Sequence, residues 1–193
     1  MRNKFRKLSI IGKENYPVVH VSWEDALAYC KWSGKRLPTE AEFEYASRGG
    51  KLDNIYSWGN EKIDEKTLKA NSWNGTFPNT NTVLDKFYYS SPVKSFSPNG
   101  YGLYDIAGNV WEWCSDWYHS EYYSMLPKKG SVNPQGPKNS YDPMEPYSDK
   151  KVIRGGSFLC NDSYCSGYRN AARMKTTPDS SSLHTGFRTV YSD

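Results

Sequence analysis

The stretch VSWEDALAYCKWSGKRLPTEAEFEYASRGG, residues 21–50, contains two consecutive helix signatures. In the first, Ser22 precedes Asp25 by three residues, and apolar residues then recur at helical spacing. In the second, Thr39 and Glu42 have the spacing of a capping box. Each run ends at a glycine, which favours a helix stop. The sequence therefore predicts two short, capped helices that follow each other closely.

Regular periodicity fades after these helices. Turn residues alternate with aromatic residues up to residue 118, and residues 119–151 are rich in Tyr, Pro, Ser and Lys, which predicts a long surface or binding loop. A strand pattern returns in VIRGGSFLC, residues 152–160, and HTGFRTVYSD, residues 184–193, is a candidate closing strand. The pattern indicates an irregular, loop-rich α+β domain.

The composition is that of one aromatic-rich domain. The 193 residues include 16 Tyr, 7 Trp and 7 Phe, a chain length that fits a single core. Residues 1–15 show no strand or cap signal and are interpreted as a leader, so we assign the domain to residues 16–193. We expect a monomer.

The charge and hydropathy patterns favour neither nucleic-acid binding nor insertion into a membrane. The 25 basic and 21 acidic residues are interspersed, with a net charge of +4, so no nucleic-acid footprint is expected. No apolar run has the length of a membrane helix, and no signal-peptide core follows Met1. These features favour the cytoplasm, whereas a periplasmic or secreted location would require a different N-terminus.

Two of the four cysteines have a spacing that needs a bent loop. Cys160 and Cys165 are five residues apart in CNDSYC, and a glycine pair before them and an Asn-Asp-Ser turn between them supply the bend. Two thiolates without a nearby histidine suit Cu(I) better than tetrahedral zinc. A local disulfide or an unpaired thiol pair explains the spacing equally well. Cys30 and Cys114 lie in apolar contexts, and we assign both to the core.

The three histidines have unlike surroundings. His20 lies in an apolar run and is interpreted as a core residue, while His119 lies in the long loop and is interpreted as surface. His184, in SSSLHTGFR, is the histidine that we place near a site.

Acidic and amide side chains gather at two turn-rich stretches. Asp105, Asn109 and Glu112 occur within DIAGNVWEW, and Asn71 and Asp85 flank a second stretch. Oxygen ligands on irregular backbone suit Ca²⁺. The alternative is that these side chains brace their own turns.

Four blocks of the sequence resemble formylglycine-generating enzymes, also called sulfatase-modifying factors. These blocks are PVVHVSWEDALAYCKWSGKRLPTEAEFEYASRGG, NGYGLYDIAGNVWEWCSDW, VIRGGSFLCNDSYC and TPDSSSLHTGFR. Within the third block, the cysteine pair is the feature that marks the oxidase branch of the family. The resemblance implies a fold related to C-type lectins, structural calcium, and copper(I) held by Cys160 and Cys165. It implies a reaction that uses O₂ to convert a cysteine in a C-x-P-x-R segment of an unfolded sulfatase to Cα-formylglycine.

The same resemblance assigns further roles, motif by motif. It implies that Ser157, Tyr164 and Trp111 line the copper pocket as catalytic residues. The implied substrate-binding residues are Arg173, Ser181, His184 and Asn161. The implied calcium ligands are Asn71, Ser72, Asp85 and Phe87 at one site and Asp105, Gly108, Val110 and Glu112 at the other.

The sequence also departs from the family pattern. Positions that carry disulfide cysteines in secreted animal members are Ala46, Asn170 and Thr189 here, which favours a prokaryotic-type member. Asn161 replaces a histidine of some members, and His184 replaces an asparagine.

The family domain begins well upstream of the first helix, so the chain resembles an N-terminally truncated member. A non-catalytic lectin-like binding or structural module is therefore the alternative function. A sulfoxide-synthase-like iron enzyme is a third hypothesis, which would need a His-rich site that this sequence lacks.

Overall fold

The computed structural model describes residues 10–63 and 68–191. Both predicted helices are present, as α1 (Trp23–Trp32) and α2 (Glu40–Arg48). Each begins with a complete capping box, in which the side chain of the cap and that of the third helical residue exchange hydrogen bonds with the opposite backbone N–H. Because these contacts are local, the sequence alone was sufficient to place both helices.

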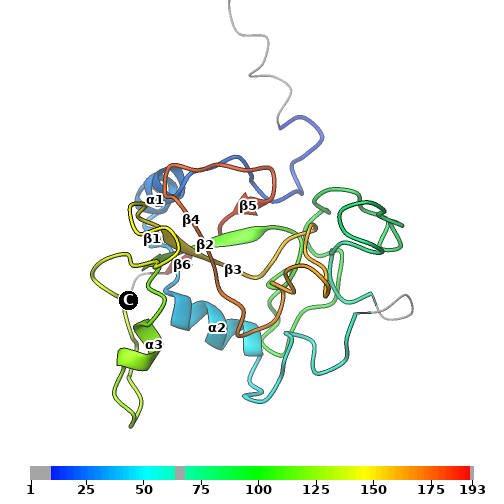
Figure 1. Cartoon of the computed structure of the whole chain (residues 1–193). Coiled ribbons are helices and arrows are strands. Elements are labelled where there is room, and N and C mark those ends of the chain that lie inside the picture. Colours follow the sequence, from blue (N-terminus) through cyan, green and yellow to red (C-terminus); the bar gives the residue numbers. More distant parts are fainter. Residues whose placement is uncertain (1–9, 64–67, 192–193) are drawn as a thin grey trace, which may run out of the picture.

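A four-stranded sheet lies at the centre of the described part of the chain, in the order β4-β3-β2-β5 (Figure 1). Its strands are β2 (Trp111–Trp117), β3 (Lys151–Arg154), β4 (Met174–Thr176) and β5 (Thr185–Gly186). The β4-β3-β2 pairs are antiparallel, whereas β5 pairs in parallel with β2. The sheet therefore brings β3 and β5, two separate late segments, beside β2, with β4 on the far side of β3.

Short elements and long loops complete the described fold. Strands β1 (Lys35–Arg36) and β6 (Val190–Tyr191) pair antiparallel, and α3 (Tyr122–Met125) is one turn in the long loop before β3. The segment between α2 and β2, drawn from cyan to green in Figure 1, runs as irregular loops beside the sheet. The loop-rich α+β prediction is confirmed.

A buried ionic network joins α2 to the sheet. Glu40 is fully buried and accepts hydrogen bonds from Arg154 of β3 (2.7 Å) and from Arg173 (2.6 and 2.8 Å). Arg154 also binds the Glu44 carboxylate at 2.9 Å and the carbonyl of Asn170. Buried charges are tolerated when they are paired and hydrogen-bonded, as they are here.

Two local expectations differ from the structure, and a third lies largely outside the described residues. His20 is exposed and has a φ of 57°, because the chain turns there before α1, so its core assignment was wrong. The closing strand is divided into β5 and β6. Of the leader proposed over residues 1–15, residues 1–9 lie outside the described residues, and residues 10–15 form turns.

Candidate functional site

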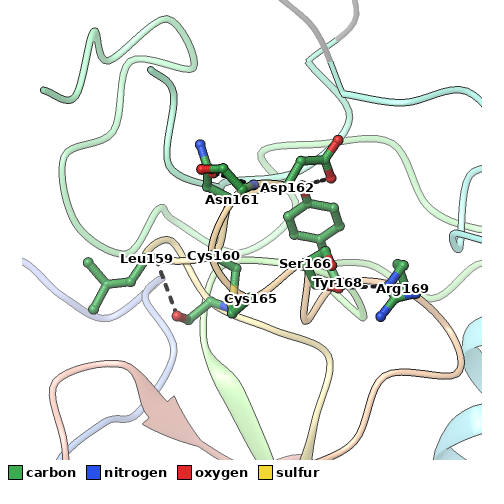
Figure 2. The surroundings of a disulfide bond; sticks show 10 residues. Leu159, Cys160, Asn161, Asp162, Cys165, Ser166, Tyr168 and Arg169 are labelled. Atoms are coloured by element: carbon green, nitrogen blue, oxygen red, sulfur yellow. Dashed lines mark hydrogen bonds between the residues drawn. A yellow bond between two sulfur atoms is a disulfide. The ribbon is translucent and has the colours of Figure 1, made fainter. Parts of the chain in front are cut away.

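Two tight turns fold the segment that contains the cysteine pair. The amide of Cys160 donates to the Ser157 carbonyl (2.9 Å), and that of Cys165 donates to the Asn161 carbonyl (3.1 Å). The Cα atoms of the two cysteines are consequently 5.4 Å apart. Figure 2 shows their side chains pointing toward each other. The predicted bend between the cysteines is therefore present.

The sulfur atoms of Cys160 and Cys165 are joined as a disulfide, which is one of the two interpretations that the spacing left open. A Cu(I) ion bound by this pair in its reduced form would require the same convergence. The backbone N–H of Ser157 points to Sγ of Cys160 at 3.4 Å. Such a donor favours negative charge on the sulfur once the pair is reduced.

The cysteine pair opens into a cavity of about 440 Å³. Every predicted catalytic residue lines it, as do two of the predicted substrate residues. These lining residues are Cys160, Cys165, Ser157, Tyr164, Trp111, Ser181 and His184. The structure thus brings together residues from β2, from the cysteine loop and from the loop before β5.

The Trp111 ring and the sulfur atom of Cys160 both lie close to Gly167 and line the same cavity. The missing side chain of Gly167 leaves room for both groups, since a Cβ built there would lie 2.6 Å from Cζ2 of Trp111 and 3.1 Å from Sγ of Cys160. The Trp111 amide also donates to the His184 carbonyl at 2.8 Å. Trp111 is therefore fixed by its strand, in the same buried cluster as Cys160.

Asn161 and Arg173 lie outside this cavity. Asn161 donates to the Gly75 carbonyl (2.9 Å), and Figure 2 shows it at the end of the loop away from the sulfur atoms. Arg173 binds Glu40 and stacks over the rings of Tyr118 and Tyr123. The structure therefore places both side chains in contacts with the scaffold.

Sequence reasoning missed several lining residues. Phe77 stacks on Tyr164, with ring centroids 4.3 Å apart and planes inclined by 20°. Lys175 lines the same cavity, and its ammonium group binds the buried Asp142 at 2.5 Å. Both partners are distant in the sequence, and no local motif signals either contact.

The other two cysteines are core residues, as predicted. Cys30 and Cys114 are free thiols, and both are buried. Burial raises the pKa of the Cys30 thiol and raises that of Cys114 well above its ordinary value. Both thiols are therefore held in the unreactive, protonated form.

The first predicted calcium set is brought together by the fold. The Asp85 carboxylate accepts the N–H groups of Ser72 (3.2 Å) and Phe87 (3.0 Å). Oδ1 of Asn71 is buried and has no hydrogen-bond partner in the described part of the chain. Burial raises the pKa of Asp85, and no ion pair to it is seen among the described residues. An unpaired buried amide oxygen and a desolvated carboxylate are both groups that a hard cation can pair with.

The second predicted calcium set is partly occupied by an arginine. Asp105, Val110 and Glu112 line one cavity of about 370 Å³ with Arg188. Arg188 binds both oxygens of Glu112, one of them through Nη2 at 2.7 Å. The Asp105 carboxylate accepts the Lys94 N–H at 2.7 Å. The carboxylate of Glu112 is already neutralised, so the case for calcium rests on the first set.

Within residues 10–63 and 68–191, no three His, Cys, Asp or Glu side chains are clustered as metal ligands. The candidate sites above use two sulfur atoms or amide and carbonyl oxygens instead. In the same ranges, no helix has the length and apolar character required to cross a bilayer.

The fold and the cavity define a class of protein: a loop-rich α+β domain of the C-type-lectin-like type with a paired-cysteine cavity. Residues 2–192 match the family model of the sulfatase-modifying factor enzyme 1-like domain. The chain belongs to this family.

Relatives and solved structures agree with this assignment. The chain is 52% identical to the formylglycine-generating enzyme of Streptomyces coelicolor, over 93% of this chain and 54% of the relative. It is 41% identical to the inactive Cα-formylglycine-generating enzyme 2 of Bos taurus, over 91% of this chain and 50% of that relative. The structure of PvdO from Pseudomonas aeruginosa matches with a TM-score of 0.68 at 28% identity, covering 91% of this chain and 61% of that one. The chain spans about half the length of the curated relatives.

Proposed function

We propose that this chain carries the catalytic centre of a formylglycine-generating oxidase. The substrate is a cysteine in a C-x-P-x-R segment of an unfolded sulfatase, and the product is the Cα-formylglycine aldehyde. The observation that carries the proposal is the convergence of Cys160 and Cys165 in a cavity lined by Trp111. The identity to relatives named formylglycine-generating enzyme supports it.

The reduced pair provides two soft thiolates, and the donor set fits copper(I). Copper(I), when bound there, would supply the redox chemistry with O₂. The chain's own groups shape the site around it. The Ser157 N–H would stabilise charge on Cys160, and the Trp111 ring lines the same cavity as an apolar surface.

The entrance of the cavity suits a polypeptide. Tyr164 is 67% exposed and stacks on Phe77, so the pair offers an apolar surface to an incoming chain. The hydroxyl group of Ser181 lies on the segment before β5 and is exposed. A cavity with aromatic and hydroxyl groups can bind the side chains and the backbone of an extended peptide.

The proposed reaction balances with an external thiol reductant. The substrate Cβ loses two electrons, its sulfur leaves as H₂S, and the aldehyde gains one oxygen. O₂ accepts these two electrons and two more from a pair of thiols, which become a disulfide, and water is released. The same reductant reduces the bond between Cys160 and Cys165 before the first turnover.

We propose calcium as a structural ion at the first set. Asn71 Oδ1, the carboxylate of Asp85 and the carbonyl oxygens of Ser72 and Phe87 would hold it. The amide of Trp73, next in sequence to Ser72, donates to the Cys160 carbonyl at 2.9 Å. An ion at this set would therefore stabilise the loop that supports the cysteine pair.

A non-catalytic binding module is the second candidate function. The 41% identity to a relative named inactive supports it. The two candidates differ in whether the cysteine pair turns over a substrate.

The test is oxidation of a C-x-P-x-R peptide by reduced protein loaded with Cu(I), in air and with excess thiol. We expect a peptide product that has lost sulfur and is trapped by a hydrazide, observed by mass spectrometry. Cys160→Ser and Cys165→Ser should each remove the product. Cys30→Ala is the matched control, because Cys30 is a core thiol outside the cavity.

Turnover by either serine variant would contradict the proposed role of the pair. A folded wild type that binds the peptide without converting it would support the binding module instead. A folded wild type that binds neither copper nor peptide would overturn both candidates.

A further inference from the structure

A series of aromatic contacts leads out of the cavity from the side of Tyr164. Tyr164 and Phe77 line the cavity and are stacked on each other. The Phe77 ring meets the Trp73 ring edge-on, with centroids 5.1 Å apart, and the Trp73 ring in turn lies 6.4 Å from that of Tyr88. The aromatic contacts at the cavity entrance therefore continue as far as Tyr88.

A second series of ring contacts leads from Tyr88 back to the cavity. The rings of Tyr88 and Tyr89 meet edge-on at 5.0 Å, and Tyr89 meets the ring of Phe158 at 5.9 Å. Phe158 lies 6.4 Å from the ring of His184, which lines the cavity. Because both series end at lining residues, Tyr88 and Tyr89 lie beside the cavity.

The side chains of Tyr88 and Tyr89 are exposed but rest on buried rings. They are 52% and 61% exposed, whereas Trp73 and Phe158, which they contact, are buried. The Trp73 amide also donates to the Cys160 carbonyl at 2.9 Å, which ties this base to the cysteine loop. Adjacent exposed tyrosines on a buried aromatic base lose little freedom on binding, and such surfaces are typical of sites that bind polypeptides.

We propose that Tyr88 and Tyr89, here called the tyrosine surface, bind apolar side chains that flank the C-x-P-x-R segment of the incoming polypeptide. This inference rests on the proposed function and extends its substrate contacts beyond the cavity. A polypeptide whose cysteine reaches Cys160 and Cys165 has to leave the cavity past its edge, and the tyrosine surface adjoins that edge. An unfolded polypeptide exposes the apolar side chains that a folded protein buries, so it carries the groups that an aromatic surface binds.

The distance from the cavity indicates which substrate residues are involved. Two ring contacts, of 5.1 and 6.4 Å, separate Tyr88 from the lining residue Phe77. An extended chain advances about 3.3 Å per residue, so it covers these contacts in about four residues. The reacting cysteine lies further inside, at the buried Cys160. Because alternate side chains of an extended chain share one face, we expect apolar residues about five and seven positions from the substrate cysteine to reach the tyrosine surface.

The probe is a fluorescent C-x-P-x-R peptide whose cysteine is replaced by serine, bound to metal-free, reduced protein and followed by anisotropy. The unextended peptide is compared with peptides that carry about eight further residues at one end, with leucine at the two expected positions or with serine at both. One set is extended at the N-terminus and another at the C-terminus, so that either direction of binding is detected.

We expect the leucine extension, at one of the two ends, to bind the wild type about tenfold more tightly than the serine extension, because leucine loses apolar surface to the tyrosine rings. Tyr88→Ser and Tyr89→Ser should each reduce this gain about threefold, and the double variant should abolish it. The unextended peptide should bind all variants within about twofold of the wild type.

Tyr147→Ser is the matched control, because Tyr147 is fully exposed in the long loop before β3. It loses the same ring from a different surface and should keep the full gain. Circular dichroism establishes that each variant is folded. Oxidation of the unextended cysteine peptide, by protein loaded with Cu(I), tests the proposed function separately.

Equal binding of the leucine and serine extensions at both ends overturns the inference, and the oxidase proposal stands if the unextended cysteine peptide is converted. A gain that survives in the folded double variant, or that Tyr147→Ser lowers equally, also overturns it. Wild-type dimers that the double variant separates, observed by light scattering, would assign the tyrosine surface to a second copy of the chain instead. A folded wild type that neither binds nor oxidises any of the peptides overturns the proposed function and this inference together.

Discussion

The ionic network under α2 and the cavity beside β2 differ in how far their polar groups are hydrogen-bonded within the protein. In the network, the buried Glu40 and Arg154 side chains are hydrogen-bonded to charged neighbours. In the cavity, Nδ1 of His184 has no hydrogen-bond partner among the described residues, and the sulfur atom of Cys160 accepts the N–H of Ser157 beside its bond to Cys165. Saturated polar groups stabilise a fold, whereas unsatisfied groups are available to a ligand.

The largest expected effect is on the network. Glu40→Gln leaves two guanidinium groups facing an amide in the core, so we expect a loss of about 3–5 kcal/mol in the free energy of unfolding. For a chain of this length, the midpoint temperature of thermal unfolding should fall by about 10 °C. Thermal unfolding followed by circular dichroism measures it.

The control for this variant is Glu61→Gln. Glu61 is 73% exposed on its side chain and pairs with Lys69 at 3.6 Å, so its loss should change stability by less than about 1 kcal/mol. Equal losses from both variants would show that burial of the ionic network contributes nothing.

The next effect is on the proposed calcium set. Ca²⁺ at about 100 times its dissociation constant should stabilise the wild type by about 2.7 kcal/mol over protein in a chelator, and Asp85→Asn should abolish this difference. Burial raises the pKa of Asp85, so the ionised carboxylate that the metal needs is lost sooner than usual as the pH falls. The difference between the unfolding midpoint with Ca²⁺ and the unfolding midpoint in a chelator should therefore become smaller as the pH falls. A gap that widens, or that survives in Asp85→Asn, contradicts the assignment.

The smallest of these effects on stability is expected for Gly167→Ala. The same substitution should clearly lower the affinity for Cu(I). The new methyl group meets the Trp111 ring and the sulfur of Cys160, and overpacking of this kind costs about 1–3 kcal/mol. Because the methyl group displaces a proposed ligand, Cu(I) affinity measured by chelator competition should fall by more than stability alone predicts. Unchanged affinity would show that this contact does not position the sulfur atom.

Local patterns made part of the fold predictable. Both helices rest on caps whose partners are three residues apart, and the cysteine bend rests on turns within CNDSYC. Strand β2 was not predicted, because Trp111, Glu112, Trp113 and Cys114 are all buried and the strand shows no alternation along these residues.

Contacts between distant segments were beyond the reach of sequence patterns. The stacking of Phe77 on Tyr164 and the ion pair of Lys175 with Asp142 depend on loops that meet only in the folded chain. His20 shows the converse case, since apolar neighbours suggested burial and a left-handed backbone turn exposes the side chain.

The parallel pairing of β5 with β2 also determines how late in synthesis the central sheet can be completed. Trp111 leaves the ribosome long before its partner Thr185, and until then one edge of β2 has no neighbour. The cavity wall that contains His184 closes only when this late segment arrives. A nascent chain that ends before this segment would hold an aromatic strand with an open edge, and open edges of this kind make partly folded chains prone to aggregation.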